Sequence, residues 1–413
     1  MKILVCNSGS SSLKVSLFEA DQELLLAEGS IDWTTNPTRL VFRRPGQPEV
    51  REELDLSEHS EALARILSDL QAGPSAPLHD LQDIDAVGHR VVHGGRDYTT
   101  AVWITPGVQK VISQLSELAP LHNPASVQGI RAIEQALPWV PQVAVFDTAF
   151  HSTLSPAART YAIPRTWTTE WGIHRFGFHG LSHAYCARQA VEMLDNSSRL
   201  VIAHLGNGAS VSAVRNGTCI DTSMGFTPLD GVVMGTRSGS LDPGVLFYVL
   251  RCKGLTVEQL DYVLNNQSGL LGLSGISPDM REILKESANS PEARLALEVY
   301  IHRVVQTIGA MAATLGGVDG LVFTAGVGEN SAKVRELVCE NLGHLGLELD
   351  TAANARCKPD ADIATRSSPG RVLVITTRED LTIVRETKRL MESKSGKDEN
   401  GSRRQLTPTT GTV

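Results

Sequence analysis

Apolar and polar positions follow the same pattern in three pairs of segments, with one member of each pair in either half of the chain. In each segment an apolar stretch, typical of a buried strand, runs into small or polar residues. In the first pair a loop containing Asn and Gly leads on to a second strand of alternating pattern. The pairs occur in the same order in both halves: residues 2–20 with 199–217, 84–95 with 318–330, and 142–154 with 371–383.

An internal repeat of this kind indicates two related domains. We expect an α/β fold, with a mixed sheet flanked by helices in each domain and loops from both facing a shared cleft. The first domain is placed at 1–148, completed by a helix at 380–393, and the second at 149–379. The polar, aperiodic residues 394–413 predict a disordered tail. Apolar residues at helical spacing predict helices at 126–137, 185–194 and 291–316.

The loop that follows the first strand, NSGSSS at residues 7–12, has two interpretations. A hairpin turn is the simpler, because Gly and Ser are common in turns. The other is an anion-binding loop whose backbone N–H and hydroxyl groups hold phosphate. The matching loop in the second half favours phosphate, because two facing loops suit a polyphosphate. The pattern GxxxxGK[ST] does not occur, which excludes a Walker-type loop.

Composition narrows the class of protein. The chain has 413 residues, enough for two domains, and a net charge of −8, which argues against a nucleic-acid partner. No apolar run reaches the ~20 residues that cross a bilayer, so we expect no membrane association. The six cysteines are scattered and predict neither a zinc site nor a disulfide framework. The N-terminal sequence MKILVCNSGS does not resemble a targeting signal, and we expect a cytoplasmic protein.

Three charged residues occur in segments where packing of the core gives no reason for a charge. Arg90 lies in the apolar strand GHRVVHGG, either as a solvated cation on an edge strand or as a ligand contact. Asp147, in FDTAFH, ends a strand, where α/β proteins collect ligands, although a helix N-cap would also explain it. Arg237, in MGTRSGSLDPG, lies between glycines and could bind carboxylate or phosphate through two hydrogen bonds.

Histidines and a glycine-rich turn add further candidates. His122 follows Pro120 in a loop, and HRFGFHGLSHAY places His179 and His183 at i and i+4. That spacing can bind zinc on a helix, but no third ligand stands in a known pattern. The segment TAGVGEN (324–330) joins a strand to a helix, where backbone N–H groups and the helix dipole can meet a nucleotide.

Taken together, the motifs NSGSSSLK, GHRVVHGG, APLHNP, FDTAFH, FGFHGLSH, HLGNGAS, MGTRSGxLDP and GVGEN resemble the acetate kinase family across about residues 1–390. That family belongs with the sugar kinases and actin. The resemblance implies two duplicated ribonuclease-H-like (actin-like ATPase) domains with the active site in the interdomain cleft. It also implies a homodimer formed through the second, nucleotide-binding domain and a place in acetyl-CoA biosynthesis.

The resemblance also implies roles for individual residues. Asp147, His179 and Arg237 would be catalytic, with His179 and Arg237 stabilising the transition state. Asn7 and Glu379 would hold Mg²⁺, with Mn²⁺ as the alternative ion. Acetate or acetyl phosphate would contact Arg90, Val92, Leu121, His122, Phe178 and Pro228, whose apolar members take the acyl methyl. ATP or ADP would contact Lys14, His204, Leu205, Gly206, Asn207, Gly208, Asp279, Met280, Arg281, Gly326, Val327, Gly328, Glu329 and Asn330.

The implied reaction is ATP + acetate ⇌ ADP + acetyl phosphate, by direct in-line attack of the carboxylate. A carboxylate is already ionised at neutral pH, so the attack needs no general base, and cations must offset the repulsion between anions. Asp147 would then orient an arginine or a metal-bound water. The alternatives are a propionate or butyrate kinase, a non-catalytic actin-like nucleotide switch and, third, a zinc hydrolase.

The chain departs from the family pattern at three positions. TREDL stands where TNEEL is expected, which introduces Arg378 and Asp380 but keeps Glu379. Ala325 stands where Gly is usual, a minor change if the backbone φ is negative there.

Overall fold

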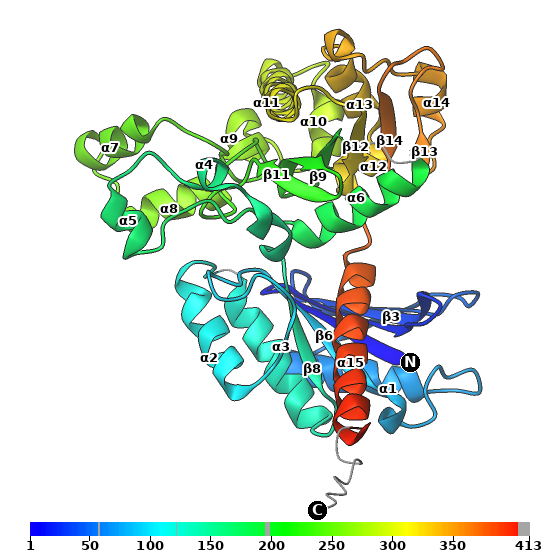
Figure 1. Ribbon diagram of the computed structural model, residues 1–413. Helices are drawn as coiled ribbons and strands as arrows, with labels where there is room; N and C mark the ends of the chain where they lie inside the picture. Colours follow the sequence, from blue (N-terminus) through cyan, green and yellow to red (C-terminus); the bar gives the residue numbers. More distant parts are fainter. Residues whose placement is uncertain (57, 121, 195–198, 404–413) are drawn as a thin grey trace, which may run out of the picture. The chain divides into compact units, whose positions relative to one another are not determined.

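The computed structural model describes residues 1–56, 58–120, 122–194 and 199–403, with side chains up to residue 393. The chain forms two compact units (Figure 1). Unit 1 comprises residues 1–149 together with the segment from residue 379 onward, and unit 2 comprises residues 150–378.

Unit 1 contains a mixed sheet in the order β5-β4-β3-β2-β1-β6-β8-β7. Strands β1, β6 and β8 run parallel to one another, whereas the other neighbouring pairs are antiparallel. The strands are β1 (Lys2–Ser8), β2 (Ser12–Glu19), β3 (Leu24–Asp32), β4 (Thr38–Arg43), β5 (Val50–Leu54), β6 (Ala86–Val91), β7 (Val102–Trp103) and β8 (Gln142–Phe146).

The sheet of unit 2 has the order β11-β10-β9-β12-β14-β13, with β9, β12 and β14 parallel. Its strands are β9 (Arg199–Leu205), β10 (Ala209–Arg215), β11 (Thr218–Thr222), β12 (Gly320–Thr324), β13 (Ala361–Asp362) and β14 (Arg371–Val374). The order β3-β2-β1-β6-β8 therefore recurs as β11-β10-β9-β12-β14. Each of the three sequence pairs falls on corresponding strands, which confirms the predicted duplication.

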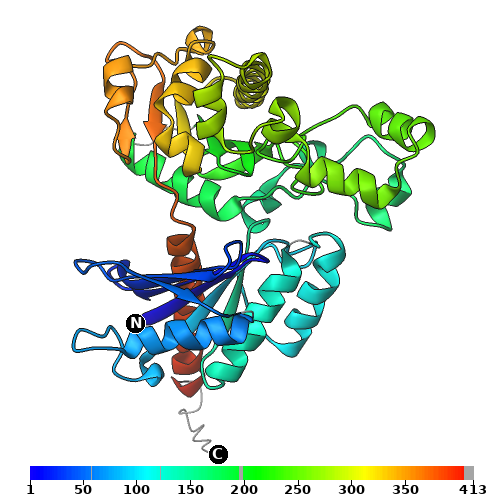
Figure 2. The ribbon, with the colours of Figure 1, turned by 180° about the vertical axis from the view of Figure 1, so that it is seen from behind.

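Helices cover both faces of the unit 1 sheet. Helix α15 (Glu379–Arg403) lies against one face, and α1 (His59–Gln71) and α3 (Asn123–Ala136) pack against the other (Figures 1 and 2). Gly88 permits the first contact, because a Cβ there would lie 2.5 Å from side-chain atoms of Ile383 and Thr387. The remaining helical segments of this unit are η1 (Leu81–Asp83), α2 (Pro106–Gln114), η2 (Leu115–Glu117) and the first residue of η3 (Ala149–Thr153).

In unit 2, α6 (Gly180–Met193) lies along one face of the sheet and the long α11 (Pro291–Leu315) along the other (Figures 1 and 2). The other helices are α4 (Pro156–Arg159), α5 (Arg165–Thr169), α7 (Pro243–Cys252), α8 (Val257–Asn266), α9 (Gly269–Ser274), α10 (Met280–Glu286), α12 (Ala325–Asn330), α13 (Ala332–Cys339), η4 (Gly343–Leu345) and α14 (Thr351–Ala355). In the described part of the chain, no helix is both long and apolar enough to span a membrane.

The predicted helices at 126–137, 185–194 and 291–316 correspond to α3, α6 and α11. The C-terminal segment differs from expectation, because α15 continues beyond residue 393 and ends at Arg403. No proline interrupts the sequence before Pro408, and its Lys, Asp and Glu residues tolerate a helix. The rest of the predicted tail, 404–413, lies outside the described residues.

Candidate active site

Polar side chains stand at the carboxyl ends of the three parallel strands of unit 1. Asn7 lies near the end of β1, Arg90 near the end of β6, and Asp147 directly after β8. Because Val5 and Cys6 pair with Gly88 and His89, Asn7 and Arg90 are neighbours on the face that α15 covers. Lys14 pairs with Asn7 across the β1–β2 ladder and is exposed. The fold thus brings four predicted residues to one region of unit 1.

Arg90 is the centre of a charged cluster. Its Nε and Nη2 donate to both carboxylate oxygens of Asp147 at 2.7–3.2 Å, and its Nη1 lies 2.9 Å from Oε2 of Glu379, the first residue of α15. Burial alone would lower the pKa of the guanidinium, but the two carboxylates outweigh burial and raise it. Arg90 is therefore a paired cation on an inner strand, and the solvated edge-strand interpretation is wrong.

Asp147 is almost fully buried, with 1% of its surface exposed. Burial raises the pKa of its carboxyl group, and the charge of Arg90 opposes that rise. His122 also acts to lower the pKa of Asp147, and this histidine stands at the N-terminus of α3. The two-bonded contact with Arg90 fixes the orientation of the guanidinium.

Unit 2 gathers a second set of predicted residues around the glycine loop after β9. A Cβ on Gly208 would lie 2.9 Å from Nη2 of Arg237 and 3.3 Å from Nε2 of His179. Arg237 also donates from Nη1 to the carbonyl of Pro228 at 2.8 Å. Burial lowers the pKa of Arg237, and among the described residues no carboxylate forms a salt bridge with it. A largely buried cation without an acidic partner is suited to receive an anion.

Four histidines lie close together beneath this loop. The rings of His179 and His204 stack with centroids 4.2 Å apart, and those of His151 and His183 meet edge to face at 5.6 Å. His179 begins α6 with a left-handed backbone, φ 57°, which is unusual for a residue other than glycine and typical of functional sites. His204 bonds from Nδ1 to the hydroxyl of Ser182 at 2.7 Å.

A pocket of about 780 Å³ lies beside the same loop in unit 2. Eight residues of the predicted nucleotide site line it: Gly206, Asn207, Asp279, Met280, Arg281, Gly326, Val327 and Asn330. Five others of that site in unit 2 do not: His204, Leu205, Gly208, Gly328 and Glu329. Sequence reasoning missed Leu270, Pro278, Leu284, Tyr300 and Ser331, which also line the pocket and carry no motif of their own.

Glu329 stabilises the backbone beside the pocket through hydrogen bonds. One carboxylate oxygen accepts hydrogen bonds from the backbone N–H of Ala325 and of Thr377, both at 2.8 Å. This carboxylate joins the start of α12 to the segment that follows β14. Ala325 itself has φ 64°, so the condition of a negative φ is not met, and alanine occupies a position that favours glycine.

A buried arginine that the sequence analysis missed supports α12 from behind. Arg335 is 2% exposed, and its Nη1 donates to the carbonyls of Gly328 and Glu329 at 2.9 and 2.8 Å. Its Nε and Nη2 donate to the side chain and carbonyl of Asn354. The guanidinium thus satisfies carbonyls at the C-terminal end of α12, where a helix leaves acceptors unpaired.

The predicted acyl-pocket residues are divided between the units. Val92 is half-buried in unit 1, whereas Phe178 is buried and Pro228 half-buried in unit 2. Leu121 lies outside the described residues. His151 holds the carbonyl of Phe178 through Nε2 at 2.9 Å and lies 3.2 Å through Nδ1 from Sγ of Cys219.

The predicted metal residues offer oxygen donors only, the amide of Asn7 and the carboxylate of Glu379. Arg378, beside Glu379, is exposed. In the part of the chain that the structure describes, no group of three His, Cys, Asp or Glu side chains is arranged to hold a metal ion. His179 and His183 both bond to the hydroxyl of Ser210, and a zinc hydrolase gains no support from their spacing.

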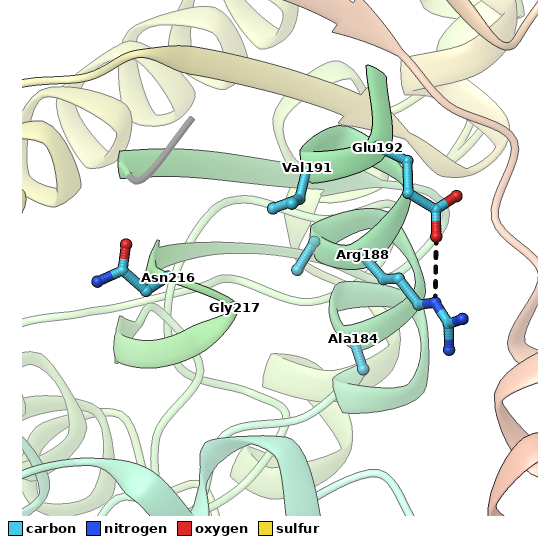
Figure 3. Close-up of a pocket in the computed structure, with 7 residues that line it drawn as sticks. Ala184, Arg188, Val191, Glu192, Asn216 and Gly217 are labelled. Atoms are coloured by element: carbon cyan, nitrogen blue, oxygen red, sulfur yellow. Dashed lines mark hydrogen bonds and ion pairs between the residues drawn. The ribbon is translucent and has the colours of Figure 1, made fainter. Parts of the chain in front are cut away.

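A separate pocket of about 480 Å³ runs along α6 (Figure 3). It is formed by one side of the helix and the turn at Asn216 and Gly217, and Arg188 pairs with Glu192 at 3.3 Å on its rim (Figure 3). None of the predicted site residues lines it. Arg188 is therefore a suitable control position for experiments on the arginines of the site.

The repeated strand order defines a protein of two duplicated α/β domains, each with a mixed sheet flanked by helices. The family model of the acetokinase family matches residues 2–385. An acetate kinase from Microcystis aeruginosa is 51% identical over 399 residues, covering 94% of this chain and 98% of its own. The chain belongs to the acetokinase family and is a kinase.

Two solved kinase structures are similar to this chain in both sequence and fold. The crystal structure of Porphyromonas gingivalis acetate kinase has a TM-score of 0.87 at 40% identity, covering 94% of this chain and 99% of its own. A propionate kinase from Francisella tularensis subsp. tularensis SCHU S4 has the same TM-score at 39% identity and the same coverage.

Acid should destabilise the fold through buried histidines such as His151. Burial lowers the pKa of His151 to about 4, against an unfolded value of about 6.5. A lowered folded pKa contributes stability that is present above the unfolded value and is lost as pH falls. The loss for this one group is about 2 kcal/mol at pH 5 and about 3 kcal/mol at pH 4.

Urea unfolding at several pH values between 7.5 and 4 measures this effect. We expect His151→Gln to flatten the acid limb relative to the unchanged protein. Burial also lowers the pKa of His89 to about 4. His89→Gln should therefore flatten the acid limb in the same way. If the free energy of unfolding falls equally steeply with pH in all three proteins, these histidines do not cause the loss of stability in acid.

Proposed function

We propose that this kinase transfers the γ-phosphoryl group of ATP to acetate, giving ADP and acetyl phosphate in a reversible reaction. The observation that carries the proposal is Arg237, a largely buried guanidinium beside Gly208 and His179 that lacks a carboxylate partner among the described residues. Such a cation calls for an anionic ligand. The neighbouring pocket of about 780 Å³ is large enough for a nucleoside phosphate.

The reaction needs charge compensation rather than a general base. Acetate is ionised at neutral pH, since its pKa is near 4, and its attack brings one anion toward another. Arg237 and His179 donate to the phosphoryl oxygens in the transition state, where such donors contribute most. Arg90 binds the carboxylate of the acyl substrate, and Asp147 holds Arg90 in the required orientation through its two hydrogen bonds.

The oxygen donors of Asn7 and Glu379 fit Mg²⁺, which is commonly held by one or two carboxylates together with water and substrate phosphates. Glu379 is the single carboxylate of this pair, which agrees with binding of the ion mainly by water and substrate phosphates. Mn²⁺ could take the same ligands. When bound, the ion would neutralise charge on the β- and γ-phosphates. Glu379 then has two tasks, since it also pairs with Arg90 at 2.9 Å.

A second candidate function is supported by one comparison. The relative from Francisella tularensis is a propionate kinase and matches as much of the chain as the acetate kinase from Porphyromonas gingivalis. Propionate differs from acetate by one methylene, which an apolar pocket discriminates weakly. A nucleotide switch without catalysis would also present phosphate oxygens to Arg237, but it would form no acetyl phosphate, so the assay below distinguishes the two functions.

The protein also forms a homodimer through unit 2. Helix α7, PGVLFYVLRC, is rich in apolar residues yet has no buried residue, and the adjoining α8 has none either. Phe247 and Tyr248 are each 54% exposed, and Tyr262 of α8 is 56% exposed. An apolar surface of this kind on a soluble protein is typical of an association site, and a second copy of the chain supplies a matching apolar face.

Arg237→Ala should lower kcat by about 10²–10³-fold, the usual cost of removing one transition-state donor. A hydroxamate assay for acetyl phosphate, with ATP, Mg²⁺ and acetate, measures it, and a chelator should abolish the activity of the unchanged protein until Mg²⁺ is restored. Arg188→Ala, on the α6 pocket, is the matched control and should retain full activity. Near-normal kcat in Arg237→Ala would remove this residue from the reaction.

Val92→Ala should shift acyl preference toward longer acids. If Val92 bounds the acyl site, its removal opens space for about two carbons, and a methylene in such a pocket is worth about 1–3 kcal/mol. The ratio of kcat/KM for butyrate over acetate should rise, while KM for ATP stays unchanged. The same assay across C2 to C4 acids tests this, and an unaltered ratio would place the acyl group elsewhere.

Replacing both Phe247 and Tyr248 by Asp should convert the dimer into monomers. Light scattering on a sizing column should give about twice 44.5 kDa for the unchanged protein and the single-chain mass for the variant. Trp139→Asp, which alters an equally exposed aromatic residue of unit 1, should remain dimeric. A single-chain mass for the unchanged protein would refute the dimer.

A further inference from the structure

The hydroxyl of Ser210 lies between two imidazole rings of unit 2. Its oxygen is 2.7 Å from Nε2 of His183 and 3.0 Å from Nδ1 of His179. Ser210, on β10, and His183, on α6, are both fully buried. His183 has no second hydrogen bond, because its Nδ1 lacks a partner among the residues that the structure describes. The three groups form a short chain that ends at His179.

A serine hydroxyl has one proton, which limits the ways in which this chain can be bonded. In the first arrangement His183 donates from Nε2 to Ser210, and Ser210 donates to Nδ1 of His179. In the second every bond is reversed, and in the third both histidines donate to Ser210. Each arrangement gives His179 a definite tautomer, because its Nδ1 either accepts or donates.

The buried surroundings favour the first arrangement. The second puts a proton on Nδ1 of His183, which leaves a buried N–H without an acceptor. The third leaves the hydroxyl proton of Ser210 without an acceptor in the described structure. Only the first pairs both the ring N–H of His183 and the hydroxyl proton of Ser210, and orphaned buried N–H groups are rarer than under-satisfied acceptors. Burial also lowers the pKa of His183 well below its usual value, so that this ring is neutral.

We infer that His183 and Ser210 are positioning residues that hold His179 in the tautomer with its proton on Nε2. This inference rests on the proposed function, in which His179 donates to the transferring phosphoryl group. Nε2 is the ring nitrogen that faces the glycine loop, 3.3 Å from the place of a Cβ on Gly208. With the proton there His179 presents a donor to phosphoryl oxygens, whereas the other tautomer would present a lone pair and repel them.

Histidine ¹⁵N spectra of the full-length protein read the tautomer directly, because protonated and unprotonated ring nitrogens have separate chemical shifts. The signal of His179 is assigned by its loss in His179→Gln. We expect Nε2 protonated and Nδ1 unprotonated in the unchanged protein, and a mixture of tautomers in Ser210→Ala. A proton on Nδ1 of His179 in the unchanged protein would overturn the inference whatever the activity.

Kinetics supply the second test. Ser210→Ala should lower kcat by about 10- to 10²-fold, less than deletion of the donor itself, with KM for ATP and acetate little changed. The matched control is Ser212→Ala, on the same strand and equally buried, whose hydroxyl bonds to Thr222 at 2.8 Å instead of to a histidine. Loss of kcat in both variants alike would indicate mere packing and overturn the inference.

His183 can be tested by conservative rescue. His183→Gln keeps an N–H donor in reach of Ser210 and should retain most of kcat, whereas His183→Met should behave like Ser210→Ala. If neither His183 variant folds, comparison of Ser210→Ala with Ser212→Ala decides whether the hydroxyl of Ser210 positions His179. The proposed function fails separately, when the unchanged protein forms no acetyl phosphate from ATP and acetate. The inference fails alone when the unchanged protein is active, His179→Ala is inactive, and Ser210→Ala keeps both its kcat and the tautomer of His179.

Discussion

The ion cluster around Arg90 is the interaction on which unit 1 depends. A buried guanidinium is tolerated only where carboxylates and hydrogen bonds replace its hydration, and its two partners come from distant parts of the chain. Asp147 follows β8, and Glu379 begins α15. The cluster thus ties the C-terminal helix to the carboxyl ends of the parallel strands. The charges that offset one another in this cluster are those that the proposed reaction would use.

Unit 2, by contrast, buries titratable side chains in their neutral form. Its histidines are buried together, and burial lowers the pKa of His151 and His183, so these rings act as hydrogen-bonding groups without charge. Arg237 is the cation at this site and lacks a carboxylate among the described residues. Positive charge is therefore left for a ligand in unit 2 but is paired in unit 1. This division suits a reaction in which phosphate oxygens and a carboxylate must be held by different arginines.

The sequence predicted the parts of the fold that repeat. Strand patterns are local, and their recurrence around Asn7 and Asn207 sufficed to predict two sheets of one topology. Contacts between distant segments were not predictable in this way. Leu270 and Tyr300 reach the pocket from α9 and α11, and nothing in their own surroundings marks them. The φ of Ala325 and the tie from Arg335 to the end of α12 depend on tertiary structure, and α15 runs further than its polar composition indicated.

Glu329 and Arg90 together constrain the peptide that leaves unit 2 for α15. The backbone N–H of Thr377 is held by Glu329, and the side chain of Glu379 is held by Arg90. A single residue, the exposed Arg378, separates these two anchored positions. At this crossing of the chain, only the backbone of Arg378 lies between a residue held within unit 2 and a residue held within unit 1. Through Glu329, the last residues of unit 2 before α15 are therefore bonded to the start of α12, which borders the pocket of unit 2.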